Sequence, residues 1–174
     1  MSTPRPAEAV KLITSIFSSH VGILKDVLHI LSVHYGGIDF LSAKMPFHYT
    51  DYYADEMGSS LERRFASFDT LIRPESLPDI KLFANSIEEK FSLSGKRRVN
   101  IDPGYVSDAH LILATGKAYS HRPYLRDGIY ADLTLVFRSK TFQPLAWTYP
   151  DYRETHVINV FNMLRAKYLA QLKH

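Results

Sequence analysis

Hydrophobic and polar residues recur with two different periods along the first half of the chain, which predicts both strands and helices. A β-branched, apolar run over residues 10–17 is typical of a buried strand. From 24 to 35, apolar side chains fall three or four positions apart, which places them on one face of a helix. Glycines 36–37 end that helix, because glycine tolerates a left-handed cap. Ile38 and Phe40 alternate with polar neighbours, which predicts a second strand, and residues 62–72 predict a third.

The second half of the chain continues this mixture. Ser76 with Asp79 resembles a capping box and opens a helix that extends to Phe91. Asp151 with Glu154 forms a second such pair, ahead of a final helix whose apolar face carries five residues: Val157, Val160, Phe161, Leu164 and Tyr168. Between the two helices, strands are predicted over 97–102, 110–115, 129–137 and 142–147, the last two as a hairpin.

The segment 129–137 alternates most regularly. Its odd-numbered positions, Ile129 to Phe137, are apolar and are expected on one face of the strand. Asp132 then falls on the opposite face. If that face is covered by other elements, Asp132 must be paired or bound to a ligand, because a buried lone charge is costly.

The order of these elements predicts an α+β protein with a mostly antiparallel sheet and helices on one face. The first part matches a ferredoxin-like βαββαβ unit, to which a C-terminal hairpin and helix are added. The sequence contains no repeat, linker or low-complexity tract, so we expect residues 1–174 to form a single domain.

Composition narrows the function. The chain has no cysteine, which excludes disulfides, thiolate zinc sites and a cysteine nucleophile, and fits a cytoplasmic protein. No apolar stretch is long enough to span a bilayer, so no membrane association is expected. The net charge of +3 is mild, and the basic residues form only one small cluster, at 96–98. RNA is therefore a less favoured partner than a small molecule.

Candidate chemistry gathers in three loop-like regions: 46–58, 100–105, and 115–127 together with 147–153. Lys117, His121 and Arg122 could hold a phosphate or carboxylate, since arginine presents a planar fork and lysine a point charge. A histidine also exchanges protons near neutral pH. The catalytic candidates are Asp51, Glu56, Asp102 and His121, and the ligand-binding candidates are Tyr53, Asn100, Tyr105, Lys117, Arg122, Tyr124, Trp147 and Tyr149.

Each candidate has a structural alternative. The cations and carboxylates could pair with one another in a buried network without a ligand, and the sequence favours neither interpretation. The tyrosines more often belong to a core with a bonded hydroxyl. Asp102 with Asp108 and His110 could hold a metal ion, but we favour a turn at Asp102 before Pro103-Gly104, so no metal site is predicted. No cofactor is indicated.

Several named activities are excluded by motif. Gly116-Lys117 is followed by Ala118, and Leu111 stands where a P-loop needs glycine. His48-Tyr49-Thr50 has no second His-x-Ser/Thr partner, so the two-histidine phosphoesterase chemistry is absent. The chain also lacks the G-x-S-x-G elbow of serine hydrolases and the H-E-x-x-H motif of zinc proteases.

Longer motifs carry a resemblance to a family. TDYYADEMG, FASFDTLI, VNIDPGY, ATGKAYSHRPYL, GIYADLTLVF and WTYPDYR together resemble the prokaryotic family known as domain of unknown function 4416. The resemblance implies no established activity. Some members carry the label "GTP-binding protein", which the altered P-loop of this chain does not support.

We therefore expect a pocket that binds a phosphate- or carboxylate-bearing small molecule, with a nucleotide as one candidate. Both a catalytic and a purely binding role fit these residues. The alternatives are a non-catalytic RNA-binding module and a protein-assembly module in which the polar motifs are architectural.

Overall fold

A computed structural model describes residues 3–47, 57 and 61–173. The helices of these residues are α1 Val21–Tyr35, α3 Leu77–Lys90 and α4 Thr155–Gln171, with 3-10 turns η2 Pro74–Ser76 and η3 Pro150–Arg153. The strands are β1 Val10–Ser18, β2 Ile38–Leu41, β3 Met45–Pro46, β4 Glu62–Ile72, β5 Val99–Val106, β6 His110–Thr115, β7 Tyr124–Arg126, β8 Ile129–Arg138 and β9 Thr141–Pro144.

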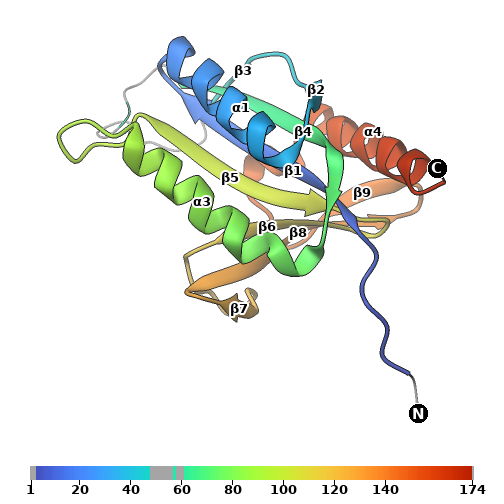
Figure 1. The fold of residues 1–174 in the computed structure, drawn as a ribbon. Coiled ribbons are helices and arrows are strands. Elements are labelled where there is room, and N and C mark those ends of the chain that lie inside the picture. The colour runs from blue at the N-terminus through green and yellow to red at the C-terminus, as the bar shows by residue number, and fades with distance from the viewer. Residues whose placement is uncertain (1–2, 48–56, 58–60, 174) are drawn as a thin grey trace.

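The strands form one antiparallel sheet, which confirms the predicted α+β class. Its order is β2-β4-β1-β5-β6-β8-β7, with β3 paired to β4 and β9 paired to β8. The first four strands of that order, with α1 and α3 as their crossovers, make up the expected ferredoxin-like βαββαβ unit. Strands β6, β8 and β7 extend the sheet from β5, and β9 is paired to β8 (Figure 1).

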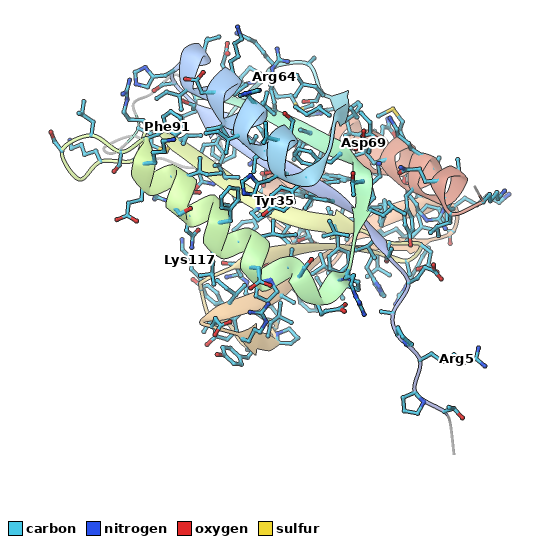
Figure 2. The ribbon with its side chains drawn as sticks, in the orientation of Figure 1. Arg5, Tyr35, Arg64, Asp69, Phe91 and Lys117 are labelled. Carbon is cyan, nitrogen blue, oxygen red and sulfur yellow. The ribbon has the colours of Figure 1, made fainter. Side chains whose placement is uncertain are left out.

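Helices cover both faces of the sheet. Alternate residues of β1 separate two cores, since Leu12 and Ile16 pack with α1 and α3, whereas Ile13 packs with α4. Figure 1 shows α1 and α3 in front of the sheet and α4 behind it. Tyr35, labelled in Figure 2, lies between α1 and α3 with its ring 6.0 Å from that of Phe83. The expectation of helices on one face therefore holds for α1 and α3, and α4 takes the opposite face.

The pairing of β5 changes along its length. Its whole length pairs with β1, but it pairs with β6 only from Gly104 to Val106. Pro103 has no N–H to donate, which suits a strand edge without a partner. The turn predicted at Asp102 is wrong, because residues 99–106 form a continuous strand that includes Asp102. The sheet thus opens between the first part of β5 and the end of β6.

A bulge in β8 overturns the simple alternation predicted for 129–137. The register with β6 shifts between Leu111, opposite Leu135, and Ile112, opposite Leu133. One extra residue in a strand moves every later side chain to the other face. Ile129 consequently packs beside α3, whereas Leu135 belongs to the core under α4. Asp132 lies on the same face as Leu135, and it is buried there.

Neither predicted capping box forms. No side chain caps the N-terminus of α3 or of α4. Asp79 instead pairs with Arg126, and Asp151 pairs with Arg63 on β4. Tertiary ion pairs have therefore taken the two carboxylates that the local pattern assigned to the helix ends.

Candidate functional site

A cavity of about 490 Å³ lies where β5 and β6 separate. It is bounded by α3, the open part of β5, the end of β6, β8 and η3. Its polar lining residues are Arg63, Lys81, Asn85, Glu88, Arg97, Asn100, Asp102, Thr115, Lys117, Arg122, Asp132, Tyr149 and Asp151. A volume of this size accommodates a small organic ligand.

Two side chains of α3 take the place of a strand beside the open part of β5. The backbone N–H of Ile101 donates to Oε1 of Glu88 over 2.6 Å, and the Nζ of Lys81 donates to the Ile101 carbonyl over 2.8 Å. Glu88 and Lys81 are seven residues apart, so they lie on the same face of α3. Burial raises the pKa of Glu88, although Lys81 and the Ile101 N–H oppose this.

Asp102 is the most accessible carboxylate of the described lining. Its side chain is 35% exposed, whereas those of Glu88, Asp132 and Asp151 are all under 10% exposed. Lys81 lies 3.3 Å from Oδ1, and the side-chain amide of Asn100 donates to Oδ2 over 2.7 Å. Asp102 therefore faces the cavity with an ammonium beside it and keeps access to a bound molecule.

Arg122 and Asp132 form a buried pair on the opposite wall. Nε of Arg122 donates to Oδ2 of Asp132 over 2.8 Å, and its other nitrogens donate to the Lys117 carbonyl (3.1 Å) and the Tyr149 hydroxyl (2.9 Å). Desolvation lowers the pKa of Arg122, but Tyr149 and Asp132 outweigh it, so the pKa lies above its ordinary value. The sequence predicted that Asp132, if buried, must be paired or bound to a ligand. Asp132 is buried and is paired with Arg122.

Arg63 enters the cavity from β4. It is only 6% exposed, and it forms an ion pair with Asp151 on η3. Its guanidinium lies 4.2 Å from the ring centre of Phe47, with Phe17 and Tyr152 also within 6 Å. Nε of Arg63 is buried and has no hydrogen-bond partner among the residues that the structure describes. A buried donor without a partner is costly, so this nitrogen would gain from an acceptor in the cavity.

Three aromatic rings stand in a row beside this wall. The His121 ring stacks on Tyr119 at 5.9 Å and on Trp147 at 5.1 Å, measured between ring centres. Nε2 of His121 lies 3.9 Å from Oδ2 of Asp132, and the guanidinium of Arg122 lies 4.7 Å from the Tyr119 ring centre. We call Tyr119, His121 and Trp147 the aromatic ladder. It joins the cavity through Arg122 and Asp132.

The structure brings some of the predicted site residues together and separates others. Five line the cavity: Asn100, Asp102, Lys117, Arg122 and Tyr149. Lys117 follows the end of β6 and is labelled below α3 in Figure 2. His121 lies next to Asp132 of the lining, and Trp147 stacks on His121. Asp51, Tyr53 and Glu56 lie outside the described residues.

Two predicted ligand-binding tyrosines lie elsewhere. Tyr105 packs against the core that contains Leu77 and Ala114, and burial raises its pKa. Tyr124 on β7 is 59% exposed, and its ring contacts Tyr130 edge-on at 5.2 Å. Neither side chain is among those that line the cavity.

Sequence reasoning missed four charged residues of the lining, namely Arg63, Lys81, Glu88 and Asp151. A signal existed for three of them. Lys81 and Glu88 occupy positions on the apolar stripe of the 77–90 helix, and Arg63 shares a strand face with Phe65. A charge in an apolar stripe indicates a buried pair or a site. Asp151 carried no such signal, because its pairing with Arg63 joins segments 88 residues apart.

The metal alternative gains no support from the described residues. They contain no group of three or more histidines or carboxylates placed to hold an ion. Asp108 lies in the turn that follows β5, whereas Asp102 lies within that strand. Also within the described chain, no helix has both the length and the apolar composition that crossing a bilayer requires.

Comparison with known proteins gives one match. No curated protein sequence and no solved structure matches this chain. The family described as "Domain of unknown function (DUF4416)" matches residues 8–168 and so covers the sheet, α1 and α3, and nearly all of α4. The chain is therefore a member of the DUF4416 family.

Proposed function

We propose that the cavity between β5 and β6 binds a small molecule that bears a phosphate or carboxylate group. The observation that carries this proposal is Arg63, a buried cation on the cavity wall whose Nε has no acceptor among the described residues. Its partner Asp151 neutralises the charge but does not use all of the N–H donors of the guanidinium. An oxyanion in the cavity would accept from them in a bidentate manner, as arginine favours.

The charge of the lining supports an anionic ligand. Its described residues include five cations, Arg63, Lys81, Arg97, Lys117 and Arg122, and four carboxylates, Glu88, Asp102, Asp132 and Asp151. The cations therefore outnumber the carboxylates in the described lining. In a partly enclosed space this excess attracts anions more strongly than it would on an open surface.

The charged residues of the lining differ in exposure and would contact different parts of the ligand. Lys117 is exposed, Asp102 is partly exposed and Arg63 is buried, and all three line the cavity. Asp102 can accept a hydrogen bond from a ligand hydroxyl or remove its proton, so it remains the catalytic candidate of the described lining. Arg122 and Asp132 hold the wall in place through their mutual pairing.

The same arrangement argues for a small molecule over RNA. The cations surround a cavity, whereas a nucleic-acid backbone is contacted by charges spread along a surface. Arg97 of the basic cluster at 96–98 contacts Asn100 and Glu88 in the lining, which draws it toward the cavity.

Ligand-induced stabilisation tests the proposal. We would measure the Tm of the wild type against inorganic phosphate, pyrophosphate, ribose 5-phosphate and citrate. At one hundred times its Kd, a ligand stabilises a protein by about 2.7 kcal/mol. We expect at least one compound to raise the Tm in a saturable manner. Lys117→Ala should weaken its binding.

Lys90→Ala is the matched control, because Lys90 is equally exposed on α3 but outside the cavity lining. It removes the same charge and should leave binding unchanged. The proposal fails if none of the four compounds raises the Tm. It also fails if Lys90→Ala and Lys117→Ala weaken binding equally, which would indicate general charge attraction.

A further inference from the structure

The aromatic ladder lies outside the described lining of the cavity, yet it is held in place and open to solvent. Tyr119 is 60% exposed and Trp147 is 41% exposed. The indole N–H of Trp147 donates to the Leu133 carbonyl of β8 over 2.9 Å, which ties the ring to the sheet. An aromatic surface that is both held rigid and left uncovered is suited to stacking on a planar partner.

Two residues of the cavity lining contact the ladder. Arg122 lines the cavity and lies over the Tyr119 ring, and Asp132 lines the cavity and faces His121. The hydroxyl oxygen of Tyr149, two residues after Trp147, accepts a hydrogen bond from Arg122, and Tyr149 also lines the cavity. A molecule whose anionic group lies in the cavity would therefore have the ladder beside it.

We infer that the ligand of the cavity is a nucleotide-like molecule, in which a planar heteroaromatic ring stacks on the aromatic ladder while its phosphate lies among the cations. This inference rests on the proposed function and adds the ring. Stacking of a base on aromatic side chains favours large flat rings and requires no particular hydrogen-bond pattern. Purines stack well for this reason, so AMP and GMP are suitable probes.

Trp147 makes the inference measurable, because it is the only tryptophan of the chain. A ring stacked on the ladder should quench its fluorescence, and the signal can come from no other tryptophan. We would titrate the wild type with AMP, GMP, ribose 5-phosphate and adenosine, and follow tryptophan emission and Tm in parallel. AMP or GMP should quench in a saturable manner and bind about tenfold tighter than ribose 5-phosphate.

The chain offers a matched pair of variants. Tyr119→Leu removes one ring of the ladder, and Tyr124→Leu removes an equally exposed tyrosine, 59% against 60%, that lies outside the ladder and the cavity lining. We expect Tyr119→Leu to reduce the affinity for AMP or GMP toward that for ribose 5-phosphate. Tyr124→Leu should bind as the wild type does.

The outcomes separate the two proposals. If ribose 5-phosphate binds as tightly as AMP and GMP without any quenching, the stacking inference is overturned and the anion cavity stands. If adenosine binds as tightly as AMP, or both tyrosine variants lose affinity equally, the inference that one ligand uses both the cations and the ladder is overturned. If none of the four compounds binds by either readout, the stacking inference is overturned, and the anion cavity is judged separately by phosphate, pyrophosphate and citrate.

Discussion

The carboxylate of Glu88 on α3 accepts a hydrogen bond from the backbone N–H of Ile101, at the part of β5 that β6 leaves unpaired. Lys81 donates to the carbonyl of the same residue. The two side chains therefore satisfy the N–H and C=O of Ile101 without a neighbouring strand. The cavity exists because side chains satisfy the backbone here, where a neighbouring strand would fill the space.

Glu88 should make stability depend on pH. Burial raises its pKa above the ordinary value of 4.5, so the folded protein holds this proton more tightly than the unfolded chain does. The burial cost is absent below the unfolded pKa and appears as the pH rises through the folded pKa. Relative to the wild type, Glu88→Gln should therefore become steadily more stable as the pH rises from about 4. Urea unfolding at several pH values would measure this difference.

Glu89→Gln is the control for that experiment, since Glu89 is exposed on the same helix. Its stability relative to the wild type should stay nearly constant over the same range. A constant difference for Glu88→Gln as well would mean that Glu88 titrates alike in the folded and unfolded chain.

Arg122 and Asp132 should be strongly coupled. Both are buried, and removing one leaves the other without its counter-charge, which typically costs about 3–5 kcal/mol. Arg122→Met and Asp132→Leu should each destabilise the protein, whereas the double variant should lose less than the sum of the two. Denaturant unfolding of all four proteins gives the coupling energy. Additivity within about 0.5 kcal/mol would contradict a direct interaction.

Gly104 should be intolerant of a side chain. A Cβ there would lie 2.4 Å from the Ile112 carbonyl oxygen, where β5 and β6 are paired. Gly104→Ala should therefore cost about 1–3 kcal/mol through overpacking. Gly116→Ala is the counterpart, because a Cβ at Gly116 meets nothing within 4 Å. Thermal unfolding should show a lowered Tm for the first variant only, and equal losses would contradict this explanation.

Asp151→Asn should alter anion binding in the direction opposite to Lys117→Ala. It removes the carboxylate that competes for Arg63 and leaves a cation without its counter-charge. The free protein should lose stability, and the affinity for inorganic phosphate should rise several-fold by charge alone. Phosphate titrations followed by Tm would measure both effects.

Asp127→Asn serves as its control, because Asp127 is exposed and outside the cavity lining, and asparagine tolerates its positive φ of 54°. It should change neither the stability nor the affinity. Weaker phosphate binding by Asp151→Asn would argue that Asp151 itself contacts the ligand.

Local pattern predicted most of the elements because each depends on neighbouring residues. The apolar stripe of α1, the glycines after it and the β-branched run of β1 all act within a few positions. The capping pairs failed because Asp79 and Asp151 had stronger partners elsewhere. The alternation in β8 failed because a bulge depends on the partner strand, which the sequence of β8 does not contain.

The candidate site divides in the same way. Residue type alone selected Lys117, Arg122 and Asp102, since cations and carboxylates in unusual motifs stand out along the chain. Arg63 and Glu88 could be recognised in the sequence only as charges in apolar stripes. Their place in the cavity lining became clear only with their partners, Asp151 and the Ile101 N–H. The sequence by itself determined the α+β class, the ferredoxin-like order and the chemical character of the site, because these follow from periodicity and residue type. Only the tertiary structure decided where β5 and β6 part and which charges meet there, because strand register and long-range pairing are set by contacts between segments far apart in the chain.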